Sequence, residues 1–274
     1  MATVSVLQMN SGATWAENKA KVEALFAQLP AARPQLVLLP EAFSCFGAGE
    51  ANIRQHAEPL GQGPVQEYLS ALAKQHNVWV LAGTLPILSG TRYAAASLLF
   101  NAQGAQCARY DKLHLFDAAV ADNTKQYRES RYTQPGSQVR VVDTPFGRLG
   151  MAICYDVRFP ELFRQLRTEG AELISLPSAF TKVTGKAHWD ILIRARAIEN
   201  QVYMLAPNQW GEHADGRETW GHSMIVDPWG VVVAQQSSGE GIASATLDMK
   251  ALEAVRANMP VLAHNRFEVR FIHE

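Results

Sequence analysis

Few cysteines, a nearly balanced charge and no long apolar run characterise this chain of 274 residues. The three cysteines, Cys45, Cys107 and Cys154, are too few and too scattered for a disulfide framework, and no Cys-x-x-Cys pair indicates zinc. The formal net charge of -1 leaves no basic excess to attract nucleic acid or anionic lipid. No apolar stretch has the length of a membrane span, and residues 1–9 lack the pattern of a signal peptide. We therefore expect a cytoplasmic protein in a reducing compartment, with no nucleic-acid or membrane partner.

Several common site motifs are also missing. The chain contains no Gly-x-Gly-x-x-Gly, no Gly-x-x-x-x-Gly-Lys-Ser/Thr, no Gly-x-Ser-x-Gly and no His-Glu-x-x-His. These absences argue against the dinucleotide, nucleoside-triphosphate, serine-nucleophile and zinc sites that the motifs mark. Nothing else in the sequence indicates a metal or an organic cofactor, so we expect neither.

Short apolar runs alternate with segments of helical periodicity, which predicts a layered α/β protein with mixed rather than purely parallel sheets. No change in composition marks a domain boundary, so we expect one domain over residues 1–274. The expected strands are 4–9, 36–39, 78–82, 97–100, 105–110, 149–153, 172–176, 202–206, 223–226 and 231–234. The expected helices are 14–29, 64–76, one from 160, 186–200 and 248–259, the last with Leu252, Val255 and Met259 facing inward.

The stretch 147–161 is the most informative part of the chain. Its apolar run 149–153 is too short for a helix and ends at Cys154, and Pro160 and Glu161 then suit the first turn of a helix. Cys154 is therefore expected between the carboxyl end of a strand and the start of a helix, where α/β proteins bind ligands and where a thiol can be activated. On its own, Cys154 could equally be a buried structural cysteine.

Two other reactive side chains occupy the same position relative to a strand. Glu41 and Lys112, like Cys154, each follow an apolar run. If the three strands lie side by side in one orientation, a carboxylate, an ammonium and a thiol meet at one edge of the sheet, as covalent catalysis requires. Taken singly, Glu41 could be a solvated residue at a strand end and Lys112 a surface lysine; their shared placement favours a site.

The segment 113–138 is polar and lacks periodicity, and a loop of this length in a compact domain is usually functional or disordered. Among eight dispersed histidines, His114, His188 and His222 lie nearest to these motifs in the sequence. A Cys–His pair therefore stays open, although we expect core or supporting hydrogen-bonding roles for all three.

Three segments of the chain resemble the nitrilase superfamily of carbon–nitrogen hydrolases, which use a Glu–Lys–Cys triad. They occur in the order of that family, and the resemblance runs from the first strand almost to the end. The segments are Leu-Pro-Glu-Ala-Phe at 39–43, Tyr-Asp-Lys-Leu-His-Leu-Phe-Asp at 110–117 and Cys-Tyr-Asp-Val-Arg-Phe-Pro-Glu at 154–161.

The resemblance implies a role for each matching residue. Cys154 would be the nucleophile, Glu41 the general base, and Lys112 the cation beside the developing oxyanion. Glu129 matches a second family glutamate in the loop after the lysine, and the backbone N–H of Tyr155 would complete the oxyanion hole with Lys112. The implied fold is a four-layer α-β-β-α sandwich whose protomers pair, with the tail 261–274 at the interface of a homodimer or higher homo-oligomer.

Further segments, including Pro-Ser-Ala-Phe at 177–180, resemble the Nit branch of this superfamily. That branch contains amidases of deaminated glutathione and ω-amidases of α-ketoglutaramate, and Ser178 favours the first because ω-amidases tend to carry glycine there. Arg158 matches a family arginine that pairs with a substrate carboxylate, although an ion pair with Glu161 is an alternative. Phe180 and Thr184 are placed like pocket residues of this branch.

The resemblance implies an amidase that cleaves a small carboxylate-bearing primary amide to acid and ammonia through a Cys154 thioester, with deaminated glutathione as the favoured substrate. The alternatives are α-ketoglutaramate, a nitrile or an N-carbamoyl compound. A binding or scaffold protein without catalysis is the alternative from another class, and it is disfavoured because all three triad residues are present. Arg196 and Glu199, three residues apart on a predicted helix, are expected to form a structural pair.

Overall fold

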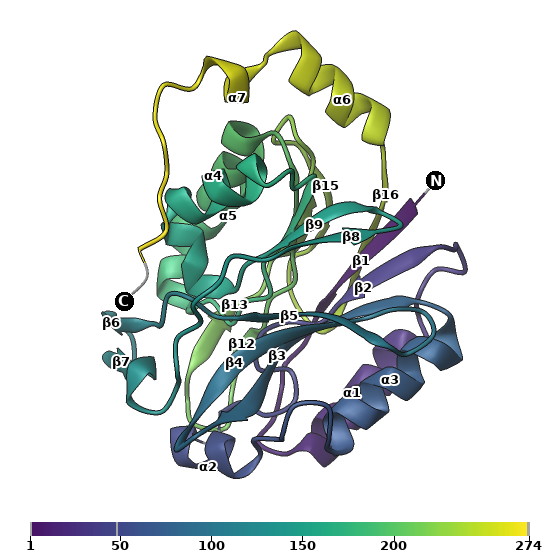
Figure 1. Ribbon diagram of the computed structural model, residues 1–274. Helices are drawn as coiled ribbons and strands as arrows, with labels where there is room; N and C mark the ends of the chain where they lie inside the picture. Colours follow the sequence, from purple (N-terminus) through teal and green to yellow (C-terminus); the bar gives the residue numbers. More distant parts are fainter. Residues whose placement is uncertain (1, 48, 273–274) are drawn as a thin grey trace.

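Two six-stranded sheets packed face to face, with helices on both outer faces, form the architecture of the computed structural model, which describes residues 2–47 and 49–272 (Figure 1). Helices α1 (Trp15–Phe26) and α3 (Pro64–His76) cover one sheet. Helices α4 (Pro160–Thr168) and α5 (Lys182–Asn200) cover the other. The predicted α-β-β-α sandwich with mixed sheets is confirmed.

The first sheet has the order β16-β1-β2-β3-β4-β5. Strands β1, β2 and β3 are parallel, whereas β16 pairs with β1, and β4 pairs with β3 and β5, in the antiparallel sense. Strands β2 and β5 therefore point the same way although β3 and β4 separate them. Their bounds are β1 Ala2–Gln8, β2 Gln35–Leu38, β3 Trp79–Ser89, β4 Arg92–Phe100, β5 Gln106–Asp111 and β16 Gly241–Leu247.

The second sheet has the order β15-β14-β11-β10-β9-β8. Its centre, β9-β10-β11, is parallel, and the outer strands are antiparallel to their neighbours. Short parallel strands covered on both faces account for the apolar runs in the sequence. Their bounds are β8 Val141–Thr144, β9 Gly147–Met151, β10 Leu173–Ser175, β11 Tyr203–Ala206, β14 Ser223–Val226 and β15 Val232–Gln236.

Smaller elements connect the layers. Two hairpins stand outside the main sheets, and 3-10 helices lie in the loop before β8 and directly after β9. These elements are α2 Gly49–Gln55, β6 Asp117–Ala119, β7 Gln126–Arg128, η1 Glu129–Arg131, η2 Cys154–Arg158, β12 Trp210–Glu212, β13 Glu218–Trp220, α6 Met249–Asn258 and α7 Val261–His264.

Helix starts follow from local chemistry. The Thr14 side chain accepts a hydrogen bond from the N–H of Glu17, as the capping signal predicts. Helix α3 has no side-chain cap of its own at Gly63; instead the buried carboxylate of Glu58 accepts the N–H of Val65 at 2.8 Å. An acceptor from outside the helix thus satisfies one of its first backbone donors.

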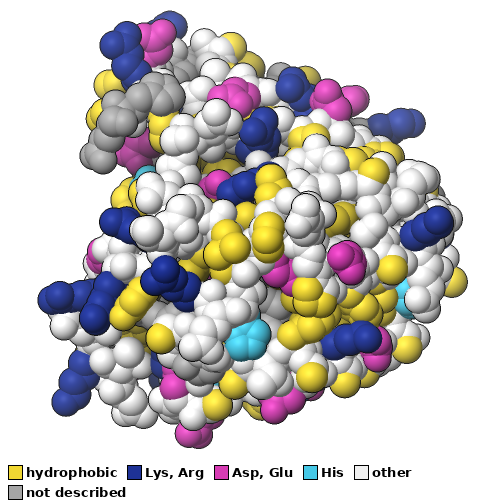
Figure 2. All heavy atoms as spheres, turned by 60° about the horizontal axis from the view of Figure 1, so that its bottom comes forward, with side chains coloured by type: hydrophobic (Ala, Val, Ile, Leu, Met, Phe, Trp, Pro, Cys, Tyr) yellow, Lys and Arg dark blue, Asp and Glu magenta, His cyan; other side chains and the backbone are white. Residues whose placement is uncertain are grey.

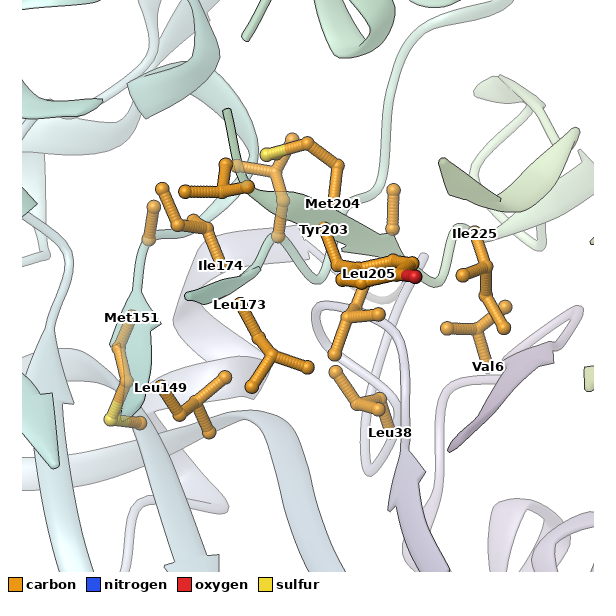
Figure 3. Packing of buried hydrophobic residues seen from close by; sticks show 14 of the residues in the cluster. Val6, Leu38, Leu149, Met151, Leu173, Ile174, Tyr203, Met204, Leu205 and Ile225 are labelled. Carbon is orange, nitrogen blue, oxygen red and sulfur yellow. The ribbon is translucent and has the colours of Figure 1, made fainter. Parts of the chain in front are cut away.

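The main core lies between the two sheets. Ile225 of β14 and Val6 of β1 point toward each other across this space, and Leu205 of β11 points toward Leu38 of β2 (Figure 3). All four side chains are completely buried. Each such side chain contributes roughly 1.5–3 kcal/mol of burial free energy, so this interface holds the sheets at a fixed separation.

Some predicted elements need correction. Strand β3 does not end at Ala82 but continues to Ser89 and forms a hairpin with β4. Strand β16 is absent from the predictions, and the irregular segment 113–138 contains the β6–β7 hairpin. Met259 does not face inward: it lies just beyond α6 and is 52% exposed, whereas Leu252 is buried.

The surface matches the balanced composition. On the face drawn in Figure 2, basic and acidic side chains are interspersed, and hydrophobic side chains reach the surface between them. Within residues 2–47 and 49–272, no helix has the length and apolar character needed to cross a membrane.

Candidate active site

Glu41, Lys112 and Cys154 come together, although not as one sheet edge. Glu41 follows β2 and Lys112 follows β5, and both strands belong to the first sheet. Cys154 follows β9, which belongs to the facing sheet. The three strands therefore do not lie side by side in one sheet. The three side chains line one cleft because the two sheets pack with these strand ends next to each other.

Lys112 lies at the centre of a buried charge cluster. Its Nζ donates to Glu41 Oε1 at 2.7 Å and to the two carboxylate oxygens of Glu129 at 3.1 and 2.9 Å. Only 2% of Lys112 is exposed. Two carboxylates around one ammonium give the paired, hydrogen-bonded arrangement that a buried charge needs. Glu129 also accepts the N–H of Phe116 at 2.7 Å, which fixes the loop that follows Lys112.

Glu41 is held by groups from several parts of the chain. Its Oε2 accepts the backbone N–H of Ala179 at 2.8 Å, and its backbone carbonyl accepts the side-chain amide of Gln209 at 3.0 Å. The next residue, Ala42, donates its N–H to Thr84 Oγ1 at 2.8 Å. The carboxylate therefore keeps one orientation, with one oxygen bonded to Lys112 and the other to the backbone beside the cleft.

Cys154 begins the 3-10 helix η2 in an unusual backbone conformation. Its φ angle is 43°, in the left-handed region that residues other than glycine rarely adopt. Its N–H donates to the carbonyl of Pro177 at 3.0 Å, and 9% of the residue is exposed. Such strain persists only where the surroundings enforce it, and it is common at functional sites.

Asp156 supplies that enforcement. Its fully buried carboxylate accepts hydrogen bonds from the N–H of Ile153 at 2.8 Å and the hydroxyl of Tyr110 at 2.7 Å. The backbone N–H and Nδ1 of His114 also bond to it, at 3.1 and 2.7 Å. Asp156 thus connects the Cys154 turn with the residues on either side of Lys112. No motif in the sequence marks Asp156 as part of the site.

The environment shifts the protonation of the reactive groups. Burial and the neighbouring Glu41 carboxylate raise the pKa of the Cys154 thiol well above 9.0, although Lys112 opposes the shift. Burial disfavours the charge on Lys112, but Glu129 and Glu41 outweigh it and raise the pKa of the ammonium well above 10.5. Burial raises the pKa of Glu129 above 4.5. The thiol therefore holds its proton until a base removes it, and Lys112 stays charged.

The cleft above these groups has an empty volume of about 1100 Å³ including its open mouth. Tyr155, Arg158, Phe180 and Thr184, all predicted from the sequence, line it. Phe116 also contributes a wall and contacts the Tyr155 ring edge-on, with ring centroids 4.9 Å apart.

Arg158 is available to a ligand. Its guanidinium lies 5.2 Å from the centroid of the Phe180 ring, and Nη1 is 3.3 Å from Nδ1 of His188. In the part of the chain that the structure describes, no carboxylate lies within ion-pair distance of it, so the alternative pair with Glu161 does not form.

The other predicted residues lie around the site. His114 stacks on Phe159 and His222 stacks on Trp220. None of His114, His188 and His222 is among the described residues that line the cleft. Arg196 and Glu199 form the expected ion pair at 2.8 Å, and Arg196 Nε bonds to the carbonyl of Val157.

Comparison with known proteins agrees with this geometry. The sequence model of the carbon-nitrogen hydrolase family matches residues 3–257. A protein of Yersinia enterocolitica named deaminated glutathione amidase is 46% identical over 269 residues, which cover 97% of this chain and 93% of that protein. A protein of Mus musculus with the same name is 39% identical, covering 96% of this chain and 83% of its own length.

Solved structures of related proteins are also similar to this chain. The crystal structure of the C. elegans NitFhit protein superposes with a TM-score of 0.91 at 37% identity, covering 99% of this chain and 67% of that one. Saccharomyces cerevisiae Nit3, described as a member of branch 10 of the nitrilase superfamily, superposes with a TM-score of 0.85 at 31% identity, covering 97% of both chains. The chain therefore belongs to the carbon-nitrogen hydrolase family and is a hydrolase acting on carbon–nitrogen bonds other than peptide bonds.

Proposed function

We propose that the protein is an amidase that cleaves its substrate through a thioester on Cys154. The observation that carries this proposal is the Lys112 cluster: a buried lysine bonded to Glu41 and Glu129 lines the same cleft as Cys154. A base, a cation and a nucleophile in one cleft are the groups that covalent amide hydrolysis needs.

In the first half of the reaction, Glu41 takes the thiol proton of Cys154 and the thiolate attacks the amide carbonyl. The ammonium of Lys112 and the N–H of Tyr155 stabilise the oxyanion; none of the described residues accepts a backbone hydrogen bond from that N–H. Glu41 then delivers the proton to the leaving nitrogen, and the amine departs. In the second half, Glu41 activates a water molecule that hydrolyses the thioester. Glu129 holds Lys112 in place and charged.

We propose deaminated glutathione as the substrate, because relatives at 39–46% identity carry that name. In this compound an oxo group replaces the amino group of the glutamyl residue, and the scissile amide joins its side-chain carboxyl group to cysteinylglycine. This amide is secondary, so with this substrate the leaving group would be an amine, whereas the ammonia expected from a primary amide would come from α-ketoglutaramate. Hydrolysis releases cysteinylglycine and α-ketoglutarate.

Arg158 is proposed to bind the carboxylate on the acyl side of the substrate, next to Phe180 and Thr184. Its planar guanidinium suits a two-point interaction with a carboxylate. α-Ketoglutaramate carries the same acyl group with ammonia as the leaving group, so it is the second candidate. Nitriles and N-carbamoyl compounds are less favoured alternatives. If the protein is an inactive scaffold, it should turn over none of these compounds.

Turnover of these compounds by the wild type and by Cys154→Ala tests the proposal. The wild type should release cysteinylglycine from deaminated glutathione faster than it releases ammonia from α-ketoglutaramate, a nitrile or an N-carbamoyl amino acid. Cys154→Ala should abolish turnover while it unfolds at a temperature similar to that of the wild type. During turnover, intact-protein mass spectrometry should detect the acyl group on the wild type only. Full activity of Cys154→Ala would refute the mechanism.

The predicted cytoplasmic homodimer, with residues 261–274 at its interface, stays a proposal. Phe267 is 84% exposed and Ile272 is 81% exposed, as expected for apolar side chains that a second copy covers. Residues 273 and 274 lie outside the described part of the chain. Sedimentation of the full chain and of a chain ending at residue 264 would test the interface, since only the full chain should sediment as a dimer.

A further inference from the structure

We propose that Arg217 and Arg128 bind a second carboxylate at the leaving-group end of the substrate, which selects dicarboxylate amides over small monocarboxylate ones. This inference rests on the proposed function and extends it from the acyl half of the substrate to the half that departs. The observation that supports it is the distribution of charged side chains around the cleft.

Acidic side chains in the cleft are already paired. Glu41 and Glu129 both bond to Lys112, and Glu218 forms an ion pair with Lys182 outside the cleft. Three arginines also line the cleft: Arg128, Arg158 and Arg217. Arg217 is ion-paired with Asp215, whereas no described carboxylate pairs with Arg128 or Arg158, so positive charge remains for a ligand. The three guanidinium groups together offer more donors than a single carboxylate needs.

Arg217 is held in position with its outer nitrogens available. Its Nε donates to Asp215 Oδ2 at 2.7 Å, and its guanidinium lies 4.5 Å from the centroid of the Phe46 ring. Within the described chain, neither terminal nitrogen of Arg217 bonds to an acceptor. A guanidinium fixed through Nε and by stacking presents its two Nη groups to a carboxylate at little entropic cost.

Arg128 lies near it on a separate hairpin. It ends β7, its side chain is exposed, and Nη2 lies 3.1 Å from the side-chain amide of Gln126. None of the described carboxylates forms an ion pair with it. Residues 122–124 of the β6–β7 hairpin and 216–218 of the β12–β13 hairpin line one small pocket, so the two hairpins are neighbours, and both arginines also line the cleft.

This arrangement matches the chemistry of the proposed substrate. Deaminated glutathione has one carboxylate on the acyl side and another on the terminal glycine of the leaving group, whereas α-ketoglutaramate has only the first. Arg158, on the helix that begins at Cys154, serves the acyl side. Arg217 and Arg128, on the two neighbouring hairpins that line the cleft, are placed for the second carboxylate. An arginine–carboxylate contact is among the strongest hydrogen-bonded pairs.

The test compares deaminated glutathione with its analogue in which the terminal carboxylate is a carboxamide. The wild type should prefer the acid by about 10- to 100-fold in kcat/KM, the expected effect of losing charge-assisted hydrogen bonds. Arg217→Ala and Arg128→Ala should each reduce this acid-to-amide preference, and the double variant should bring it close to one. Arg217→Lys, which keeps the charge without the planar fork, should retain part of the preference.

Arg148→Ala is the matched control, because Arg148 is exposed, lies at the other end of β9 from Cys154 and pairs with Asp143. It should leave the preference unchanged. Equal turnover of acid and carboxamide by the wild type would overturn the inference, and this measurement does not depend on any variant folding. A wild-type preference that persists in the double variant would also overturn it. If the protein turns over neither compound, the proposed substrate is refuted, and so is the inference that rests on it.

Discussion

The hydroxyl of Tyr110 donates a hydrogen bond of 2.7 Å to the carboxylate of Asp156, 46 residues further along the chain. Tyr110 belongs to β5, two residues before Lys112, and Asp156 lies in η2, two residues after Cys154. Both side chains are buried. This bond therefore connects the element that carries the lysine with the element that carries the thiol.

Removing either partner should loosen that connection to different degrees. Tyr110→Phe loses one hydrogen bond to a carboxylate, so we expect the free energy of unfolding to fall by about 2 kcal/mol with a small loss of activity. Asp156→Ala leaves the N–H of Ile153 and the donors of Tyr110 and His114 without a partner, so it should cost at least about 3 kcal/mol and most of kcat/KM. Urea denaturation with parallel kinetics measures both. Equal effects of the two variants would show that Asp156 does not organise the turn.

Glu129→Gln tests the second carboxylate of the Lys112 cluster. The substitution keeps the shape of the side chain but removes the charge that raises the pKa of Lys112 and weakens the bonds that position its ammonium, so the proposed support of the oxyanion should suffer. We expect kcat to fall at least about tenfold with KM changed little. Glu169→Gln is the matched control, since Glu169 is exposed at the end of α4, and it should leave kcat unchanged. A fall in kcat/KM through KM alone would argue against this role.

The raised pKa values of Cys154 and Lys112 predict how stability depends on pH. Both groups hold their protons more tightly in the folded chain than in the unfolded chain. Their stabilisation is complete below the ordinary pKa and is lost as the pH rises toward the folded value. The unfolding free energy should therefore decline above pH 9.0, where the unfolded thiol of Cys154 ionises.

Urea titrations between about pH 7 and 10 measure this decline. Cys154→Ala should reduce the slope above pH 9.0 by up to about 1.4 kcal/mol per pH unit, the value for one proton. Burial also raises the pKa of Cys45, to about 11, so Cys45→Ser should reduce the slope in the same way and independently. Identical slopes in wild type and Cys154→Ala would contradict the assigned shift.

Gly83 should be essential for the position of Glu41. A Cβ atom at Gly83 would lie 1.8 Å from the carbonyl oxygen of Pro40, the residue before Glu41. Gly83→Ala should therefore destabilise the fold by more than about 2 kcal/mol and lower kcat in the folded fraction. Gly90→Ala is the control: its φ is also positive, at 58°, but no atom lies within 4 Å of the added carbon. Gly90→Ala should cost about 1 kcal/mol and keep full activity, and equal losses in kcat would exclude the steric explanation.

Arg158→Gln tests recognition of the acyl carboxylate. The variant keeps a hydrogen-bonding side chain beside Phe180 but loses the charge. We expect KM for α-ketoglutaramate to rise about tenfold or more, because the carboxylate loses a charge-assisted bond. An uncharged amide of similar size should show no such change. A fall in kcat for both compounds would point instead to a structural role.

Local signals in the sequence are sufficient for much of the fold. Helix α3 begins at Pro64 and ends at His76, as predicted, because proline favours its start and Asn77 takes the left-handed conformation that ends it. Strand β16 was missed because its core, Ala243, Ser244 and Ala245, has too little hydrophobic contrast to show alternation. The sequence predicts too short a strand for β3, because glycine and proline, here Gly83 and Pro86, usually interrupt strands.

Local signals likewise identify some of the site residues but not others. Glu41, Lys112 and Cys154 stand out because each follows an apolar strand, which is a local property. That β9 lies in the other sheet is not visible locally, since strand pairing depends on segments far apart in the chain. Asp156 was missed for the same reason: its donors include Tyr110 and His114, and nothing in the neighbouring residues marks an aspartate as their common acceptor.

The division of the reactive groups between the two sheets has a consequence for fragments of the protein. A cut in the segment between η1 and β8 would leave Glu41, Lys112 and Glu129 on one peptide and Cys154 on the other. The second peptide would also carry β16, which the first needs as the partner of β1. Neither peptide alone would be active, and mixing them would restore turnover only as they reassemble, so enzymatic complementation would report directly on the docking of the sandwich.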